Sequence, residues 1–270
     1  MKYAFFGSPK FAAIILEKLI RAGMPPAVVA CNPDRPSGRK QIVTSPPTKL
    51  LAEKHGIRVL QPDDLKIENF KLKVAEMDFG IVAAYAKILP QAIIENFKLG
   101  IIGVHPSLLP KYRGATPIQN ALLAGEAETG TTLFLLDAKV DHGPIIASRK
   151  LQIANSDNYE TLLEKLANLS ADLLIETLPK FNTGAVDLIA QDESQATYTK
   201  KFATEDAFVD FQKDDTVSVQ RKIRALNPEP GVYSVKNGKR VKILDQNTVH
   251  IEGKKPQKIA DLYSFFLRTE

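Results

Sequence analysis

Short apolar runs alternate with segments of helical periodicity along roughly the first 180 residues. Apolar runs bounded by turn residues are typical of buried strands, and apolar spacings of three and four are typical of the helices that cover them. Strands and helices in alternation predict a parallel sheet with right-handed crossovers, hence an α/β fold of the Rossmann-like class. The predicted strands are 2–6, 27–31, 58–60, 79–83, 101–104, 131–136 and 145–153, and the predicted helices are 9–22, 47–56, 67–77, 91–97, 116–124 and 158–178.

The first strand ends in Gly7-Ser8-Pro9, which opens the first helix. Ser8 is expected to cap that helix, with Pro9 at its first position. A strand, a tight turn and a helix resemble the start of a dinucleotide-binding unit. The segment GSPKFA lacks the GxGxxG spacing, however, so a dinucleotide site is only weakly supported.

A stretch rich in Pro, Gly, Ser and Arg follows the second strand, from residue 31 to 46. This composition predicts no regular structure, and long loops of that kind are often functional. The stretch carries the cations Arg35, Arg39 and Lys40. It is either a solvated connector or a loop that clamps a phosphate-bearing substrate.

The pattern changes in the last third of the chain. A polar, turn-rich segment is followed by a helix at 217–226 and by short strands at 232–235, 241–244 and 249–251. Asn237-Gly238 is a hairpin turn signal, and several short strands predict a small OB-like β-barrel. We therefore expect a first domain at 1–183, a linker at 184–203 and a basic C-terminal domain at 204–270.

Charge is unevenly distributed along the chain. The whole sequence has a formal charge of +5, but residues 221–258 hold ten Lys or Arg against three Asp or Glu, a net of +7. Arg221 and Arg224 begin this segment, on the predicted helix. Such a face is either solvated or fits a nucleic-acid backbone.

Composition excludes some classes of protein and site. No run approaches the roughly 18–20 apolar residues of a membrane span, and the N-terminus has no apolar signal region. The single cysteine, Cys31, cannot form an internal disulfide, which fits the cytoplasm. The four histidines are scattered along the sequence, so no metal site is expected. The sequence contains no GxxxxGK[ST] segment, so no dependence on ATP is expected. We expect a monomer with no membrane partner.

Candidate chemistry lies where two apolar runs end. His105 follows the run 101–104, and Asp141 follows the run 131–136. A nearby carboxylate fixes the imidazole tautomer and favours its charged form, which makes a general acid/base pair. Alone, each residue could equally cap a loop. A Ser-Leu-Leu-Pro turn and a Tyr-Arg-Gly segment, expected to be exposed, lie nearby and favour a site. His142 is expected to be structural or exposed.

Eight motifs carry a family resemblance in their order and spacing: GSPKFAA, PDRPSGR, AYAKILP, VHPSLLPKYRGATPIQNALLAG, ETGTT, DHGPI, ATYTKK and LNPEPG. Together they resemble the methionyl-tRNA formyltransferases, a family of folate-dependent formyltransferases, over about residues 1–258. The resemblance implies transfer of a formyl group from 10-formyltetrahydrofolate to the amino group of initiator methionyl-tRNA. The final segment EGKKPQKIADLYSFFLR arrives early, which implies a shortened C-terminal domain.

The resemblance also implies roles for single residues. His105 and Asp141 match the family's catalytic His and Asp. The family's folate-binding turn falls on Ser107, Leu108, Leu109 and Pro110, and the pterin pocket falls on Tyr85, Ile88 and Leu89, mostly through backbone groups. Arg39 matches the loop that reaches the tRNA acceptor stem, and the expected tRNA contacts are Arg35, Arg39, Lys40, Arg221 and Arg224.

One position departs from the family pattern. The family has a catalytic Asn where this chain has Gly103. Loss of one oxyanion donor typically costs about 10²–10³ in rate. Water could fill the vacated volume and donate weakly. The chain is then an altered but active enzyme, a nearly inert relative that still binds, or a deliberately substituted form.

Two other functions remain open from the sequence. A sugar-nucleotide N-formyltransferase would share the catalytic core and act on an amino sugar, and the shortened C-terminal region favours it. The arginine-bearing loop favours tRNA instead, because phosphate contacts dominate the affinity for nucleic acid. A folate- or tRNA-binding protein without catalysis is the third possibility.

Overall fold

The computed structural model describes residues 1–37, 41–63, 74 and 76–267. The chain forms two compact units. The first, here called the sheet unit, comprises Met1–Arg113, Gly130–Leu151 and Glu164–Thr197, and the second unit comprises Gly114–Thr129, Gln152–Leu163 and Tyr198–Glu270. The second unit thus draws two segments from the predicted first domain, and the domain boundaries proposed from the sequence stay a prediction.

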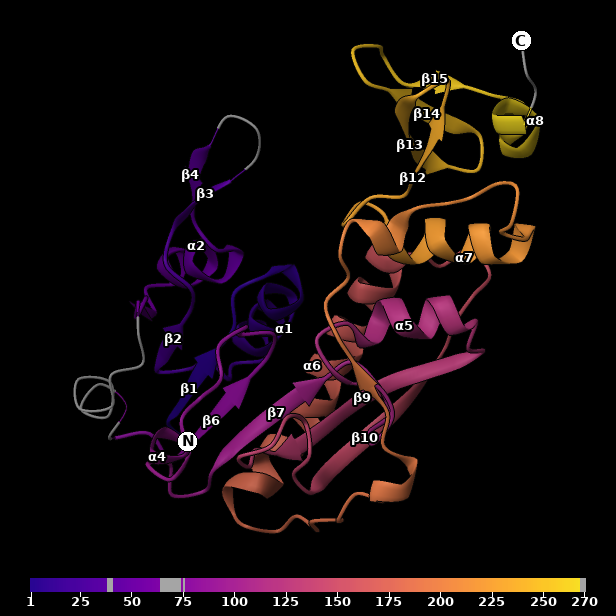
Figure 1. The fold of residues 1–270 in the computed structure, drawn as a ribbon. Coiled ribbons are helices and arrows are strands. Elements are labelled where there is room, and N and C mark those ends of the chain that lie inside the picture. Colours follow the sequence, from indigo (N-terminus) through magenta and orange to yellow (C-terminus); the bar gives the residue numbers. More distant parts are fainter. Residues whose placement is uncertain (38–40, 64–73, 75, 268–270) are drawn as a thin grey trace. The chain divides into compact units, whose positions relative to one another are not determined.

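A seven-stranded sheet carries the core of the protein (Figure 1). Strands β5, β2, β1, β6 and β7 run parallel, and β9 pairs with β7 in the antiparallel direction. The five parallel strands confirm the predicted Rossmann-like fold class, whereas the antiparallel β9 departs from the fully parallel sheet that the sequence predicted. In sheet order the seven strands are β10 (Ile145–Gln152), β9 (Glu128–Leu135), β7 (Ile101–His105), β6 (Phe79–Val82), β1 (Tyr3–Phe6), β2 (Val28–Ala30) and β5 (Arg58–Leu60).

Helices cover the sheet with the faces that the apolar spacing predicted. In α1, Phe11, Ile15 and Leu19 are buried, and strands β1 and β7 are buried throughout. Buried strands of this kind are typical of parallel sheets, whose two faces are both covered. Among the described residues, the helices that lie wholly or partly in the sheet unit are α1 (Lys10–Arg21), α2 (Pro47–Lys54), α4 (Gln91–Ile94) and α6 (Tyr159–Asn182). Most of the predicted helix 67–77 lies outside the described residues.

Two local predictions were wrong. Ser8 does not cap α1: Pro9 occupies the N-cap position, and the Ser8 hydroxyl accepts a hydrogen bond from the backbone N–H of Asn32 at 2.9 Å. The stretch 31–46 contains a short antiparallel hairpin, β3 (Arg35–Ser37) and β4 (Ile42–Thr44). Cross-strand pairing supplies partners for backbone groups there despite the prolines.

The base of this hairpin is held by Asp34. Its carboxylate accepts hydrogen bonds from Lys49 Nζ at 2.7 Å, Gln61 Nε2 at 2.7 Å and Ser45 Oγ at 3.0 Å. The Lys49 ammonium, with help from Gln61, holds the pKa of the Asp34 carboxyl below its usual range. The composition of the stretch does not reveal these partners.

The second unit combines two packed helices with a small sheet. Helix α5 (Pro117–Ala124) packs on α7 (Thr216–Leu226). An antiparallel sheet follows, and its first turn has positive φ at Asn237 and Gly238, as the Asn-Gly signal requires. Its strands are β12 (Tyr233–Lys236), β13 (Lys239–Asp245), β14 (Thr248–Ile251) and β15 (Gln257–Lys258), and α8 (Leu262–Leu267) ends the described chain.

Short elements complete the description. They are β8 (Arg113–Gly114), β11 (Tyr198–Thr199) and the 3-10 turns η1 (Glu193–Gln195) and η2 (Glu205–Ala207). Among the helices that the structure describes, none combines the length and apolar character needed to cross a bilayer.

Candidate active site

His105 is the last residue of β7, and its imidazole is 6% exposed. Its Nε2 lies 2.8 Å from the carbonyl oxygen of Tyr112. That oxygen can only accept, so Nε2 carries a hydrogen, and Nδ1 is the ring nitrogen left for proton transfer. Nδ1 faces Asp141 Oδ2 at 3.5 Å. The structure therefore brings together the two residues that the sequence singled out.

Asp141 reaches His105 through a loop that turns back along the sheet. β9 is antiparallel to β7, with Thr132 opposite His105 and Leu135 opposite Ile102. The chain thus leaves β9 three residues away from His105, a strand distance of about 10 Å. The return brings the Cα of Gly143 against the carbonyl of Leu135, where any side chain would collide.

The turn after His105 is clamped to β9. Ser107 is fully buried, and its hydroxyl donates to the carbonyl of Lys111 at 2.6 Å. Thr132 Oγ1 donates to the carbonyl of Ser107 at 2.7 Å and accepts from the N–H of Leu109 at 3.1 Å. The predicted folate turn, residues 107–110, therefore has a fixed backbone.

The second predicted folate segment follows β6. Ala84 and Ala86 have φ of 49° and 61°, which is uncommon for residues with a Cβ. The Tyr85 ring between them is buried edge-on against Phe6, and burial raises the pKa of its hydroxyl to about 12. Ile88 is 85% exposed, whereas Leu89 is buried. Ile88 is therefore a large exposed apolar side chain of this segment that can meet a ligand.

Gly103 is enclosed by apolar side chains. A Cβ built on it would collide with the ring of Phe134 and with Cδ1 of Leu136. Phe134 pairs with Gly103 across the strands and is 3% exposed. Water therefore has no room at this position, because the aromatic ring of Phe134 occupies the volume.

The predicted tRNA-binding residues have different surroundings. Arg35 is exposed on β3, while Arg39 and Lys40 lie outside the described residues. Arg224 is partly buried, and it donates from Nε to the carbonyl of Asp157 at 2.6 Å and from Nη2 to that of Ala154 at 3.1 Å. The Arg221 guanidinium packs on Gly125. Both arginines of α7 thus also hold the second unit together.

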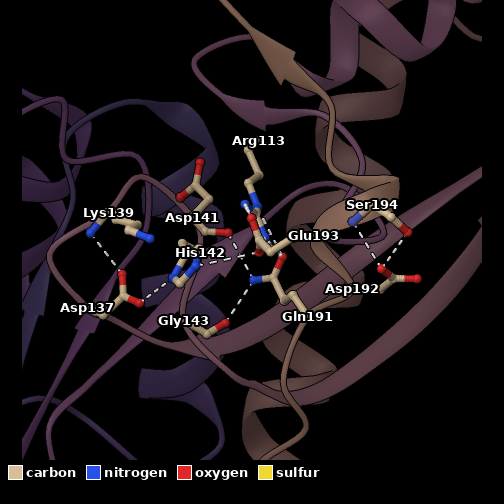
Figure 2. A network of polar contacts seen from close by, with 10 residues as sticks. All are labelled: Arg113, Asp137, Lys139, Asp141, His142, Gly143, Gln191, Asp192, Glu193 and Ser194. Carbon is tan, nitrogen blue, oxygen red and sulfur yellow. Dashed lines mark hydrogen bonds and ion pairs between the residues drawn. The ribbon is translucent and has the colours of Figure 1, made fainter.

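A polar network around Arg113 was missed by the sequence reasoning (Figure 2). The Arg113 side chain is 0% exposed, so the expectation of an exposed Tyr-Arg-Gly was wrong at this residue. It binds Gln191 and Glu193, and His142 binds Asp137 through Nδ1 at 2.6 Å. The Arg113 guanidinium holds the pKa of the Glu193 carboxyl below its ordinary value of 4.5. The sequence signal that could have indicated this network is Arg113 itself, an arginine in a stretch rich in apolar and turn residues.

A metal site receives no support from the described part of the chain. There, no three side chains of His, Cys, Asp or Glu gather in a way that could hold an ion. The paired imidazole and carboxylate beside a clamped turn suit reactions in which a proton moves, and group transfer within an α/β fold is one such reaction.

The comparisons with known proteins give the particular family. The formyl transferase family matches residues 1–178, and the formyl transferase C-terminal domain matches residues 201–264. The chain belongs to the formyl transferase family and is a formyl-transfer enzyme by class.

Individual relatives agree with that assignment. The chain is 44% identical to a methionyl-tRNA formyltransferase of Kosmotoga olearia, over 90% of this chain and 78% of the relative. It is 42% identical to one of Methylococcus capsulatus, over 85% of this chain and 75% of the relative.

Solved structures share the fold at lower identity. A Helicobacter canadensis N-formyltransferase, solved with folinic acid and dTDP-3-aminofucose, has a TM-score of 0.64 at 20% identity, over 92% of this chain and 88% of the other. HypX from Aquifex aeolicus, solved with tetrahydrofolic acid, has a TM-score of 0.64 at 19% identity, over 91% of this chain and 37% of that longer one.

Proposed function

We propose that this enzyme transfers the formyl group of 10-formyltetrahydrofolate to the amino group of methionine on initiator methionyl-tRNA, in the cytoplasm. The observation that carries the proposal is the His105–Asp141 pair, set 3.5 Å apart in a chain that matches both formyl transferase domains. The sequence identity of 42% and 44% to two methionyl-tRNA formyltransferases supports tRNA as the acceptor.

The reaction needs one proton to move and one oxyanion to be stabilised. The methionyl amine attacks the formyl carbon, so the new C–N bond forms and the carbonyl oxygen becomes an oxyanion. When the tetrahedral intermediate collapses, the bond from the formyl carbon to the folate N10 breaks, and N10 takes the proton that the amine releases. Nδ1 of His105 with Oδ2 of Asp141 is the unit that can hold this proton. The Nε2 contact with Tyr112 keeps the ring in that orientation.

The folate donor is assigned to the clamped turn 107–110 and to the segment 85–89. Support comes from the fixed backbone of the turn, the exposed Ile88 and the positive φ angles beside Tyr85. Strained backbone held by its surroundings is typical of functional sites. Folate derivatives in two distantly related structures agree with such a donor.

The tRNA partner is assigned to cationic surfaces. Arg35 is exposed on the β3–β4 hairpin, and the second unit exposes Lys239, Arg240, Lys242, Lys254 and Lys255. Lysine and arginine side chains of this kind give affinity through phosphate contacts and the release of counterions.

Gly103 does not argue against catalysis. Phe134 fills the volume that a side chain at this position would need, so the glycine leaves no cavity there. We propose an active enzyme whose oxyanion is stabilised by substrate groups and by the positive charge of the His105 imidazole while it holds the proton of the amine, with a lower rate than a site that has an additional donor.

The test is mass-resolved formylation with 10-formyltetrahydrofolate and two acceptors, methionyl-tRNA and a nucleotide-linked amino sugar. The proposal predicts a mass gain of one formyl group on methionyl-tRNA alone. Formylation of the amino sugar alone would show that the acceptor is a sugar and would contradict the proposed tRNA acceptor. Binding of folate and tRNA without product from either acceptor would show a binding protein without catalysis and would overturn the proposal.

A further inference from the structure

The loop that carries Asp141 has no strand of its own to hold it. It must return about 10 Å along β7 to reach His105. Asp141 itself has φ of 48°, in the left-handed region that residues with a Cβ rarely adopt. Since His105 is fixed at the end of a buried strand, the distance between imidazole and carboxylate depends on what holds this loop.

Gln191 makes two of the contacts that hold it, beside those of His142 with Asp137 and Glu193 (Figure 2). Its Nε2 donates to the carbonyl of Asp141 at 3.0 Å and to the carbonyl of Gly143 at 2.8 Å. One side-chain amide therefore binds the backbone on both sides of His142, although it lies about fifty residues further along the chain. These two bonds set the direction of the peptide at the residue whose carboxylate faces His105.

Arg113 in turn fixes Gln191. Its Nε and Nη2 donate to Gln191 Oε1 at 3.1 Å and 2.8 Å, and its Nη1 and Nη2 bind the two carboxylate oxygens of Glu193 at 3.0 Å and 2.6 Å. With Oε1 held by the guanidinium, the amide of Gln191 can present only its Nε2 to the loop. A planar guanidinium bound on two edges has little freedom to rotate.

The same segment also reaches His105. Tyr112, whose carbonyl binds Nε2 of His105, donates its N–H to Thr197 Oγ1 at 2.8 Å, and Arg113 donates its N–H to the carbonyl of Thr197 at 2.8 Å. Residues 112–113 and 191–197 thus contact both members of the pair. The sequence pattern predicts a linker over 184–203, whereas in the structure this segment also supports the site.

We propose that Arg113 and Gln191 are positioning residues for the Asp141 carboxylate, acting on the formyl transfer proposed above and resting on it. Gln191 holds the Asp141 loop through its amide N–H groups, and Arg113 orients that amide. Neither residue needs to touch the substrate.

Gln191→Glu separates positioning from packing. A glutamate keeps the size of the side chain and the bond to Arg113, but it cannot donate to the two carbonyls and repels them. The matched control is Gln212→Glu, the same change on an exposed residue of the second unit, outside the segment 191–197. A displacement near 1 Å at a reacting group typically costs about 10²-fold in rate, so we expect Gln191→Glu to lower kcat about 10- to 100-fold.

The readouts distinguish the outcomes. We expect the KM for methionyl-tRNA and the melting temperature of Gln191→Glu to stay close to wild type, and Gln212→Glu to keep full kcat. Arg113→Lys, which loses the fork but keeps the charge, should lower kcat in the same direction. Unchanged kcat in Gln191→Glu beside an active wild type would overturn the positioning role, as would a loss of kcat matched by unfolding. An inactive wild type would instead refute the proposed function.

Discussion

The polar groups around His105 and the cations of the second unit differ in how they are held. Arg113 is fully buried and bound on two edges, and His105 is fixed at both ring nitrogens. Lys239, Lys242 and Lys254 are exposed to solvent. Proton transfer requires atoms placed to within a fraction of an ångström, whereas attraction to phosphate requires charge near a surface. The comparison predicts that changes in the site act on kcat and that changes in the cations act on binding and its salt dependence.

The largest effect is expected from His105→Asn. Asparagine cannot carry the proton between the amine and the folate nitrogen, and general acid–base catalysis contributes about 10²–10⁴-fold, so kcat/KM should fall by about 10³. Initial rates of formylmethionyl-tRNA formation measure this, with tRNA binding as the control for folding. A rate within threefold of wild type would remove His105 from the mechanism.

Gly103→Asn tests the packing of the site interior. Phe134 occupies the space that the new side chain needs, and overpacking typically costs about 1–3 kcal/mol, so the free energy of unfolding should fall and activity should not rise. Combining it with Phe134→Val should recover part of the loss.

Urea unfolding of the four forms gives the coupling between the two positions. We expect a favourable interaction of about 0.5–3 kcal/mol, the range for residues in contact. Additive effects would show that Phe134 does not determine what residue 103 can be.

Smaller effects are expected from the exposed cations. Lys239→Ala combined with Lys242→Ala should weaken tRNA binding several-fold and lower the slope of log affinity against log salt by about one for each phosphate that is no longer neutralised. The matched control is Lys98→Ala, an exposed lysine of the sheet unit. An unchanged salt slope in the double variant would show that these two lysines of the small sheet do not contact the tRNA.

The smallest effect concerns acid stability. The pKa of Glu193 is lowered in the folded protein by Arg113, so its contribution to stability is present above its ordinary value of 4.5 and is lost as pH falls through the lower folded value. Glu193→Gln should therefore show a shallower loss of unfolding free energy below about pH 4.5 than wild type. Because the carboxylate is more than half exposed, the difference should be small. Parallel pH curves for the two proteins would contradict the pairing.

Local pattern predicted much of the fold. The strand at 58–60 and the Asn-Gly hairpin were found where apolar runs and turn residues predicted them. His105 and Asp141 were found because each follows an apolar run. Single-sequence reasoning reaches these features because their causes lie within a few neighbouring residues.

What the sequence could not supply were partners distant along the chain. Ser8 binds Asn32, Arg113 binds Gln191, and Phe134 fills the space beside Gly103. A polar residue in a turn-rich segment, such as Gln191, looks like part of a solvated linker until the fold places it beside a buried guanidinium. The return of the Asp141 loop along β7 likewise depends on the strand register.

The most direct test is the single-turnover rate of methionyl-tRNA formylation at saturating enzyme, for wild type and Asp141→Asn at several salt concentrations. The account predicts that Asp141→Asn is slower by about 10² at every salt concentration, within the range for acid–base groups, and that it binds tRNA as wild type does. Equal single-turnover rates for the two proteins would contradict it.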